Sequence, residues 1–242
     1  GLAQGAYRTD EGEPWALPSV REAERRVVAR AEDKEYLPVE GHAGFRELTA
    51  RFALGDESSA IREDRLACVQ TLSGTGALRC AADFLKVVAG VDTVWVPIPT
   101  YGNHPRIFRT AGLSIRQYSY IDGHGTGLDY AGMLESLREA PRGDAVLLHA
   151  CAHNPTGVDL SAEQWRELSM LFRERGLVPI FDSAYQGFAS GDPVADAISM
   201  RMFVDAGIER VIICQSYAKS MGLYGERVGA LLVLCGDTAE QR

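Results

Sequence analysis

Residues 211–227, VIICQSYAKSMGLYGER, decide how the rest of the chain is interpreted. An apolar run typical of a buried strand leads to Lys219, with Ser216 three residues before it and Arg227 eight residues after it. A lysine amine attacks a carbonyl only when deprotonated, and burial or a nearby cation lowers its pKa enough for this near neutral pH. Serine and arginine are suitable phosphate ligands. The pattern therefore indicates pyridoxal phosphate, with a surface lysine in a strand-to-helix loop as the alternative.

The composition bounds the class of protein. The chain has 242 residues, 46% of them hydrophobic, which is enough for one large core and one main domain. Its net charge of −8 disfavours binding to nucleic acid or to anionic membranes. No apolar run is long enough to cross a bilayer. Five cysteines without CxxC spacing indicate reduced thiols of an intracellular protein rather than a disulfide framework or a zinc site.

Apolar runs alternate with helical patterns through most of the chain, which predicts an α/β fold. Strands that are apolar on both faces are typical of a mostly parallel sheet covered by helices on both sides, a three-layer sandwich. The seven expected strands are residues 67–72, 93–98, 113–120, 145–151, 177–181, 210–215 and 229–235. The expected helices are residues 18–34, 43–54, 76–88, 103–110, 129–139, 161–175 and 195–206.

In such sheets, binding sites form beyond the carboxyl ends of the strands. The first of these strands runs into Ser73, Gly74 and Thr75, a small glycine-rich turn that opens a helix and suits an anion. A dinucleotide fingerprint is the alternative, but the third glycine and the acidic residue after a second strand are missing. We expect a phosphate-binding turn here, although helix capping alone also explains such residues.

The second strand ends near Tyr101 and His104, where a ring can stack on a flat heterocycle and a histidine can support a buried carboxylate. The fourth ends at His149, Cys151 and His153, which are metal-ligand types. Because these residues alternate along a strand and its exit, they need not converge on one point, and we predict no metal site.

The ends of the fourth and fifth strands add further polar groups. Asn154 precedes a proline, which favours extended backbone and a directed side-chain amide. Asp182 is expected to leave an apolar strand, where a carboxylate is costly to bury without a cationic partner such as a protonated pyridine nitrogen. Tyr185 follows closely and can reach the same ring.

Together these residues resemble the class I aminotransferases, and most closely the aspartate aminotransferases. The resemblance covers nearly the whole chain. It rests on the motifs GAYR at 5–8, EYLP at 35–38, SGTGAL at 73–78, NH at 103–104, HNPTG at 153–157, DSAYQGF at 182–188 and SxxK at 216–219 with ERVG at 226–229. The motifs at 153–157, 182–188, 216–219 and 226–229 are together highly specific, whereas the turn at 73–78 is weak by itself.

The resemblance implies a fold type I homodimer that binds pyridoxal 5′-phosphate through Lys219, which also moves the proton at the substrate α-carbon. It implies that Asp182, supported by His104, pairs with the pyridine nitrogen, and that Asn154 and Tyr185 bond the ring oxygen. The implied phosphate ligands are Ser73, Gly74, Thr75, Ser216 and Arg227, with Tyr36 reaching the partner subunit's cofactor. The implied substrate contacts are Gly5, Tyr101 and Asn154. Tyr101 stands where these enzymes usually have tryptophan.

The implied reaction is transfer of the amino group of L-aspartate to 2-oxoglutarate, which gives oxaloacetate and L-glutamate by a ping-pong exchange. The implied partners are therefore amino acids and 2-oxo acids. An aromatic amino-acid aminotransferase and a non-catalytic aminotransferase-like domain stay open as alternatives. The expected compartment is the cytoplasm, with mitochondria or another organelle not excluded.

The resemblance also implies a division into domains. Residues 1–14 are expected to belong with a small domain and residues 15–242 to form the large cofactor-binding domain. The absence of an initiator methionine suggests a piece of a longer polypeptide. The arginines that bind substrate carboxylates are then expected outside this chain, together with most of the small domain.

Overall fold

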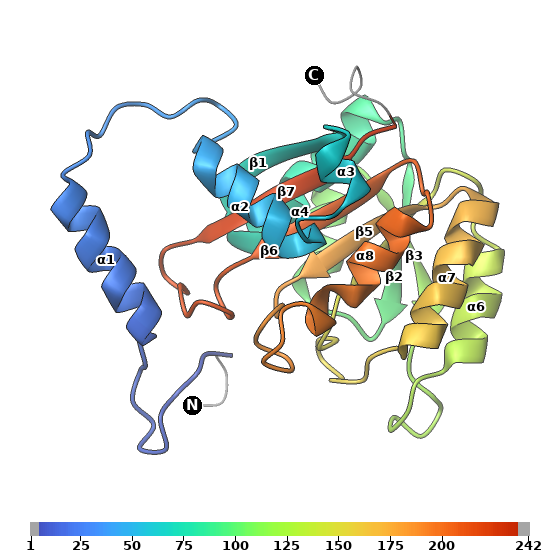
Figure 1. Ribbon diagram of the computed structural model, residues 1–242. Coiled ribbons are helices and arrows are strands. Elements are labelled where there is room, and N and C mark those ends of the chain that lie inside the picture. Colours follow the sequence, from blue (N-terminus) through green and yellow to red (C-terminus); the bar gives the residue numbers. More distant parts are fainter. Residues whose placement is uncertain (1–4, 237–242) are drawn as a thin grey trace.

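A seven-stranded sheet forms the centre of the chain (Figure 1). The computed structural model describes residues 5–236. The strands are β1 (Leu66–Leu72), β2 (Thr93–Ile98), β3 (Ser114–Ser119), β4 (Ala145–His149), β5 (Val178–Ser183), β6 (Val211–Ser216) and β7 (Val228–Leu234). Their order is β1-β7-β6-β5-β4-β2-β3, and β7 alone runs antiparallel to its neighbours. The predicted seven-stranded, mostly parallel sheet is confirmed, with strand ends shifted by at most two residues.

Helices cover both faces of the sheet and give three layers (Figure 1). One core contains residues of α2, α6, α7 and α8, and the other contains residues of α4 and α5. The helices are α1 (Pro18–Arg30), α2 (Ala43–Leu54), α3 (Ser59–Arg62), α4 (Ser73–Asp83), α5 (Asn103–Thr110), α6 (Tyr130–Arg138), α7 (Ala162–Arg175) and α8 (Ile198–Asp205).

Strand β4 shows why these apolar runs form central strands. Side chains alternate between the faces of a strand. Val146 and Leu148 lie in the core under α7 and α8, whereas Ala145 and Leu147 lie in the core under α4 and α5. A strand that is buried on both faces needs apolar residues at every position, which is the continuous pattern that the sequence shows.

Several element boundaries differ from the prediction. Helix α4 begins at Ser73 rather than Gly76, so the glycine-rich turn is the first turn of the helix itself. The same helix continues as a π-helical turn, Phe84–Val88, and a 3₁₀ turn, Ala195–Ala197, precedes α8. Helix α3 was not predicted, because four residues are too few to show a helical period.

Helix α1 stands away from the sheet (Figure 1). It forms where the sequence predicts an amphipathic helix, but it ends at Arg30, four residues before the expected end. None of its residues is buried within the part of the chain that the structure describes. In that same part, no helix combines the length and the apolar character needed to span a bilayer.

Candidate active site

A cavity of about 500 Å³ lies where β1, β4, β5 and β6 end. These four strands run in the same direction, so their carboxyl ends meet at one edge of the sheet. The predicted residues that line it are Gly5, Ser73, Gly74, Thr75, Tyr101, Asn154, Asp182, Tyr185, Ser216, Lys219 and Arg227. Groups far apart in the sequence are thus brought to one place.

Lys219 lies in the turn that follows β6 and its side chain enters this cavity. Its Nζ donates a hydrogen bond to the Gly5 carbonyl and lies 5.0 Å from the centre of the Tyr224 ring. Partial burial lowers the pKa of Lys219, and the positive charge of Arg227 lowers it further. A larger fraction of this amine is therefore deprotonated near neutral pH than for an exposed lysine.

Asp182 provides the buried carboxylate of the cavity. It lies within β5, not after it as the sequence suggested, and its side chain is 11% exposed. His104 Nε2 lies 2.9 Å from its Oδ2. Burial by itself raises the pKa of Asp182, but the hydrogen bond from His104 opposes burial, and the pKa of this carboxyl is lowered. The carboxylate therefore stays ionised although it is buried.

A chain of hydrogen bonds fixes the orientation of His104. The backbone N–H of Asn154 donates to His149 Nδ1 at 3.3 Å, and burial lowers the pKa of His149 to about 3. Neutral His149 thus carries its proton on Nε2 and donates it to Thr100 Oγ1 at 3.2 Å. The Thr100 hydroxyl then donates to His104 Nδ1 at 2.8 Å, which leaves Nε2–H of His104 to donate to Asp182.

Hydroxyl groups gather in the part of the cavity at the amino end of α4. Ser73 Oγ and Ser216 Oγ are 3.0 Å apart, and both residues are buried. The Ser73 backbone N–H donates to the Arg227 carbonyl at 3.0 Å, and the two residues have φ of 59° and 55°, a left-handed conformation that costs energy for non-glycine residues. A Cβ on Gly74 would lie 3.1 Å from Ser216 Cβ. This close packing leaves helix N–H groups facing the cavity, a favourable arrangement for an anion.

Two tyrosines border the same space. Burial raises the pKa of Tyr185, and the charge of Asp182 adds to this effect. Its phenol is therefore a hydrogen-bond donor across the physiological pH range. Tyr101 accepts a hydrogen bond from Asn103 Nδ2 at 2.8 Å, and its ring stands edge-on to His104, with ring centres 5.3 Å apart.

Two predicted residues do not line the cavity: His104 is fully buried and is connected to it through Asp182, whereas Tyr36 is fully exposed. Conversely, the cavity is lined by five residues for which the sequence pattern predicts no role there: Leu78, His149, Cys151, Ala184 and Ala218. Their residue types and spacing give no signal for this position. Thr100 was also missed, since its role depends on contacts between separate elements.

The two histidines that the sequence places at the end of β4 do come together. The chain turns after β4 and brings the ring centres of His149 and His153 within 4.2 Å. The His153 ring also stacks on Tyr120 at 3.8 Å. Among residues 5–236, no group of three potential ligands from His, Cys, Asp and Glu is arranged to hold a metal ion.

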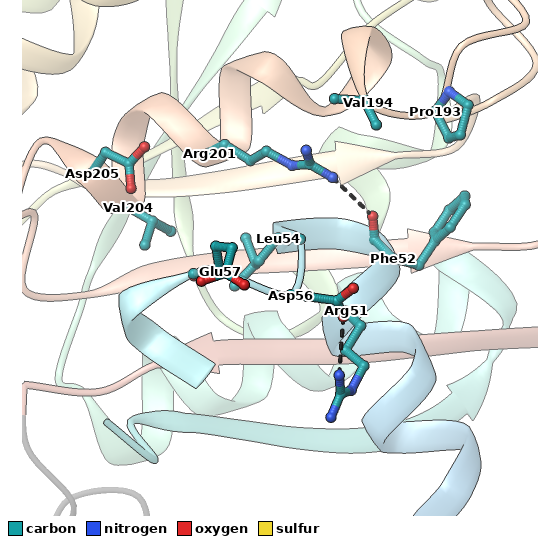
Figure 2. Close-up of a pocket in the computed structure, with 12 residues that line it drawn as sticks. Arg51, Phe52, Leu54, Asp56, Glu57, Pro193, Val194, Arg201, Val204 and Asp205 are labelled. Atoms are coloured by element: carbon teal, nitrogen blue, oxygen red, sulfur yellow. Dashed lines mark hydrogen bonds and ion pairs between the residues drawn. The ribbon is translucent and has the colours of Figure 1, made fainter. Parts of the chain in front are cut away.

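A larger cleft, of about 650 Å³, lies between the end of α2 and α8 (Figure 2). Both of its arginines are already engaged: Arg51 pairs with Asp56, and Arg201 donates to the Phe52 carbonyl. The smaller cavity is the better candidate site, because it joins a lysine of lowered pKa with a buried carboxylate and a set of hydroxyl groups.

Comparisons with known proteins agree with this geometry. The family model "Aminotransferase class I and II" matches residues 1–241. A cytoplasmic aspartate aminotransferase of Oryza sativa subsp. japonica is 53% identical over 98% of this chain and 58% of its own length. The solved aspartate aminotransferase from Saccharomyces cerevisiae cytoplasm is 40% identical, with a TM-score of 0.94 over 98% of this chain and 58% of that chain.

A solved aromatic-amino-acid aminotransferase from Burkholderia pseudomallei, described as covalently bound to pyridoxal phosphate, is 38% identical. Its TM-score is 0.93 over 99% of this chain and 60% of that chain. The chain thus spans a little over half the length of these relatives. The match of sequence and fold over nearly the whole chain shows that it belongs to the class I and II aminotransferases, a family of pyridoxal-phosphate-dependent enzymes.

Proposed function

We propose that this chain carries the cofactor-binding part of an aspartate aminotransferase, which transfers the amino group of L-aspartate to 2-oxoglutarate through pyridoxal 5′-phosphate. The observation that supports this most strongly is the single cavity that contains Lys219, Asp182 and the hydroxyl groups at the start of α4. The names of the rice and yeast relatives support the choice of aspartate.

The residues present fit the cofactor. An acid, an amine and an anion-binding turn are the three groups needed to hold a pyridinium nitrogen, an aldehyde and a phosphate, and they border one space. Ser73, Gly74, Thr75, Ser216 and Arg227 would hold the phosphate, and Asn154 and Tyr185 the ring oxygen. When bound, the cofactor supplies an electron sink for the negative charge that develops at the substrate α-carbon.

The chain's own residues then have distinct tasks. Asp182 keeps a negative charge beside the ring nitrogen, because the hydrogen-bond chain through His104 and Thr100 keeps a donor directed at it. Lys219, with its lowered pKa, is the amine that binds the aldehyde and moves the proton at the α-carbon. The ring of Tyr101 would cover the cofactor, and Gly5 would border the substrate.

Substrate choice has one alternative that a specific observation favours. Tyr101 is smaller than tryptophan and lacks the indole N–H, and the Burkholderia neighbour is named an aromatic-amino-acid aminotransferase. A panel of aspartate, tyrosine and phenylalanine as amino donors would separate the two. A higher kcat/KM for the aromatic donors would overturn the aspartate assignment.

Assembly, domains and compartment are parts of the same proposal. Two copies would share active sites, with Tyr36 of each chain reaching the cofactor of the other; its full exposure supports this. Residues 1–14 would belong with a small domain, and residues 15–242 would form the large domain. Arg8 and Pro14 pair in a bridge outside the named strands, which supports the division. The rice and yeast relatives support a cytoplasmic location.

The cofactor assignment is tested by the absorption spectrum of the purified chain after incubation with pyridoxal phosphate. We expect a visible band that borohydride abolishes while fixing the cofactor's mass on the peptide with Lys219. Lys219→Ala should show neither effect, whereas Lys86→Ala, which removes an amine outside the cavity, should behave like the unchanged chain. Labelling of other lysines in place of Lys219 would refute the assignment.

A further inference from the structure

Helix α2 contacts both of the chain segments that carry the candidate catalytic groups. One segment is the turn of residues 216–222, which carries Lys219, and the other is the loop of residues 184–193, which carries Tyr185. No residue of α2 lines the cavity of the candidate active site. The last residues of α2 border the separate cleft shown in Figure 2. The contacts on each side are specific and buried.

On the Lys219 side, the contact runs through Tyr217. This side chain is 3% exposed, and its hydroxyl donates to Thr49 Oγ1 of α2 at 2.9 Å. Its ring lies between two phenylalanines of the same helix, with ring centres 5.8 Å from Phe45 and 5.9 Å from Phe52. Tyr217 is two residues from Lys219, so α2 fixes the start of the turn that presents the amine.

On the Tyr185 side, the contact runs through Gln186, the next residue in the chain. Gln186 is fully buried, and its Nε2 donates to the Phe52 carbonyl at 2.7 Å and to the Pro193 carbonyl at 3.0 Å. The last carbonyls of a helix lack partners within the helix. Here Gln186 supplies one. Arg201 of α8 adds a weaker bond to the Phe52 carbonyl at 3.4 Å, which Figure 2 shows, and another to the Ala53 carbonyl at 3.3 Å.

Phe52 therefore joins the two segments, since its ring contacts Tyr217 and its carbonyl accepts from Gln186. We propose that α2 is a common brace that fixes the Lys219 turn relative to the Tyr185 loop, and that Thr49 and Gln186 are positioning residues for amino transfer. The positioning role of Thr49 and Gln186 in amino transfer rests on the proposed function. The fixing of one segment relative to the other by α2 does not depend on that function.

Amide hydrogen exchange of the cofactor-free chain tests the brace directly. Thr49→Val removes the acceptor of Tyr217 at nearly constant volume, and Gln186→Leu removes the bond to Phe52. A common brace requires that each variant speed exchange in both segments, 184–193 and 216–222. We expect roughly two- to tenfold faster exchange, the range for loss of one hydrogen bond. An effect of each variant on its own segment alone, or on neither, would overturn the proposal.

Two controls separate this effect from general loosening. Thr49→Ser keeps a hydroxyl and should restore normal exchange in both segments. Ser169→Ala removes a buried hydroxyl of α7 that bonds Arg166, and it should change neither segment. If Thr49→Val fails to fold, Tyr217→Phe removes the same hydrogen bond from its other end and keeps the ring.

The catalytic part is tested on the cofactor-loaded protein. Thr49→Val and Gln186→Leu should lower kcat roughly two- to tenfold with little change in KM, since they displace catalytic groups rather than substrate contacts. They should also alter the pH dependence of the absorption of the cofactor bound to Lys219. A variant that only lowers stability at a remote position should leave this pH dependence unchanged. If each variant speeds amide exchange in both segments but keeps a normal kcat, α2 is a brace without a role in catalysis. Failure of the unchanged chain to bind cofactor would count against the proposed function alone.

Discussion

Gly229 shows how closely backbone segments approach each other at the residue scale. A Cβ built on it would lie 2.6 Å from both the carbonyl carbon of Ser73 and the carbonyl oxygen of Gln215. Both neighbours are backbone, so neither can rotate away. The close approach of β7 to the start of α4 therefore requires glycine at this position.

We predict that Gly229→Ala lowers the free energy of unfolding by about 1–3 kcal/mol, the usual cost of inserting a methyl group into packed structure. Denaturant unfolding monitored by circular dichroism measures this change. Gly123→Ala is the matched control, because a Cβ there has no atom within 4 Å. Equal stability of the two variants would mean that β7 and α4 move apart easily.

Residue types at strand ends predicted most of the candidate site, and contacts between elements account for the rest. Asp182, Lys219 and the turn at Ser73 carry chemistry that apolar strands rarely tolerate, so they stood out in the sequence. The bridge of Thr100 between His104 and His149 joins three segments, and no spacing along the chain encodes such a contact.

At the scale of elements, burial on both faces made the central strands β4, β5, β6 and β7 predictable to within two residues. Such strands need continuous apolar runs, which are easy to recognise. Irregular elements were not predictable: α3 is too short for a period, and the π-helical turn at Phe84–Val88 has the same apolar spacing as an α-helix. The predicted β5 ended before Asp182, because a carboxylate is not expected inside a buried strand. Asp182 lies within β5 because His104 of α5 bonds it, and the sequence does not show that contact.

Helix α1 illustrates the difference between forming an element and packing it. Its Val28 is 78% exposed, whereas Leu54 of α2 is 4% exposed. We predict that Val28→Lys changes the free energy of unfolding by less than about 0.5 kcal/mol, whereas Leu54→Ala lowers it by about 2–5 kcal/mol. Chemical denaturation at low protein concentration measures both. A large loss for Val28→Lys would show that α1 packs on the sheet domain in solution.

At the scale of the whole molecule, the buried histidines beside the site connect its geometry to acid stability. Burial lowers the pKa of His149 to about 3 and that of His153 to about 4, from an ordinary value near 6.5. Between about pH 4 and 6.5 the unfolded chain therefore binds protons that the folded chain does not bind. Unfolding becomes more favourable as the pH falls through this window. Asp182 is an acid rather than a base, but its lowered pKa also makes the folded chain less stable as the pH falls. Its contribution to the free energy of unfolding is lost only below about pH 4.

We predict that the free energy of unfolding of the cofactor-free chain falls between pH 6 and pH 5 with a slope approaching 2.7 kcal/mol per pH unit, about 1.4 for each of the two histidines. His153→Phe keeps a ring to stack on Tyr120 but removes one titrating group, so the slope should fall to about 1.4. Gly123→Ala, in an exposed loop, removes no titrating group; it is the control and should keep the slope of the unchanged chain. Urea unfolding at several pH values measures all three slopes. An unchanged slope in His153→Phe would mean that this histidine becomes protonated without unfolding, so that the stack beneath the site opens to water before the sheet does.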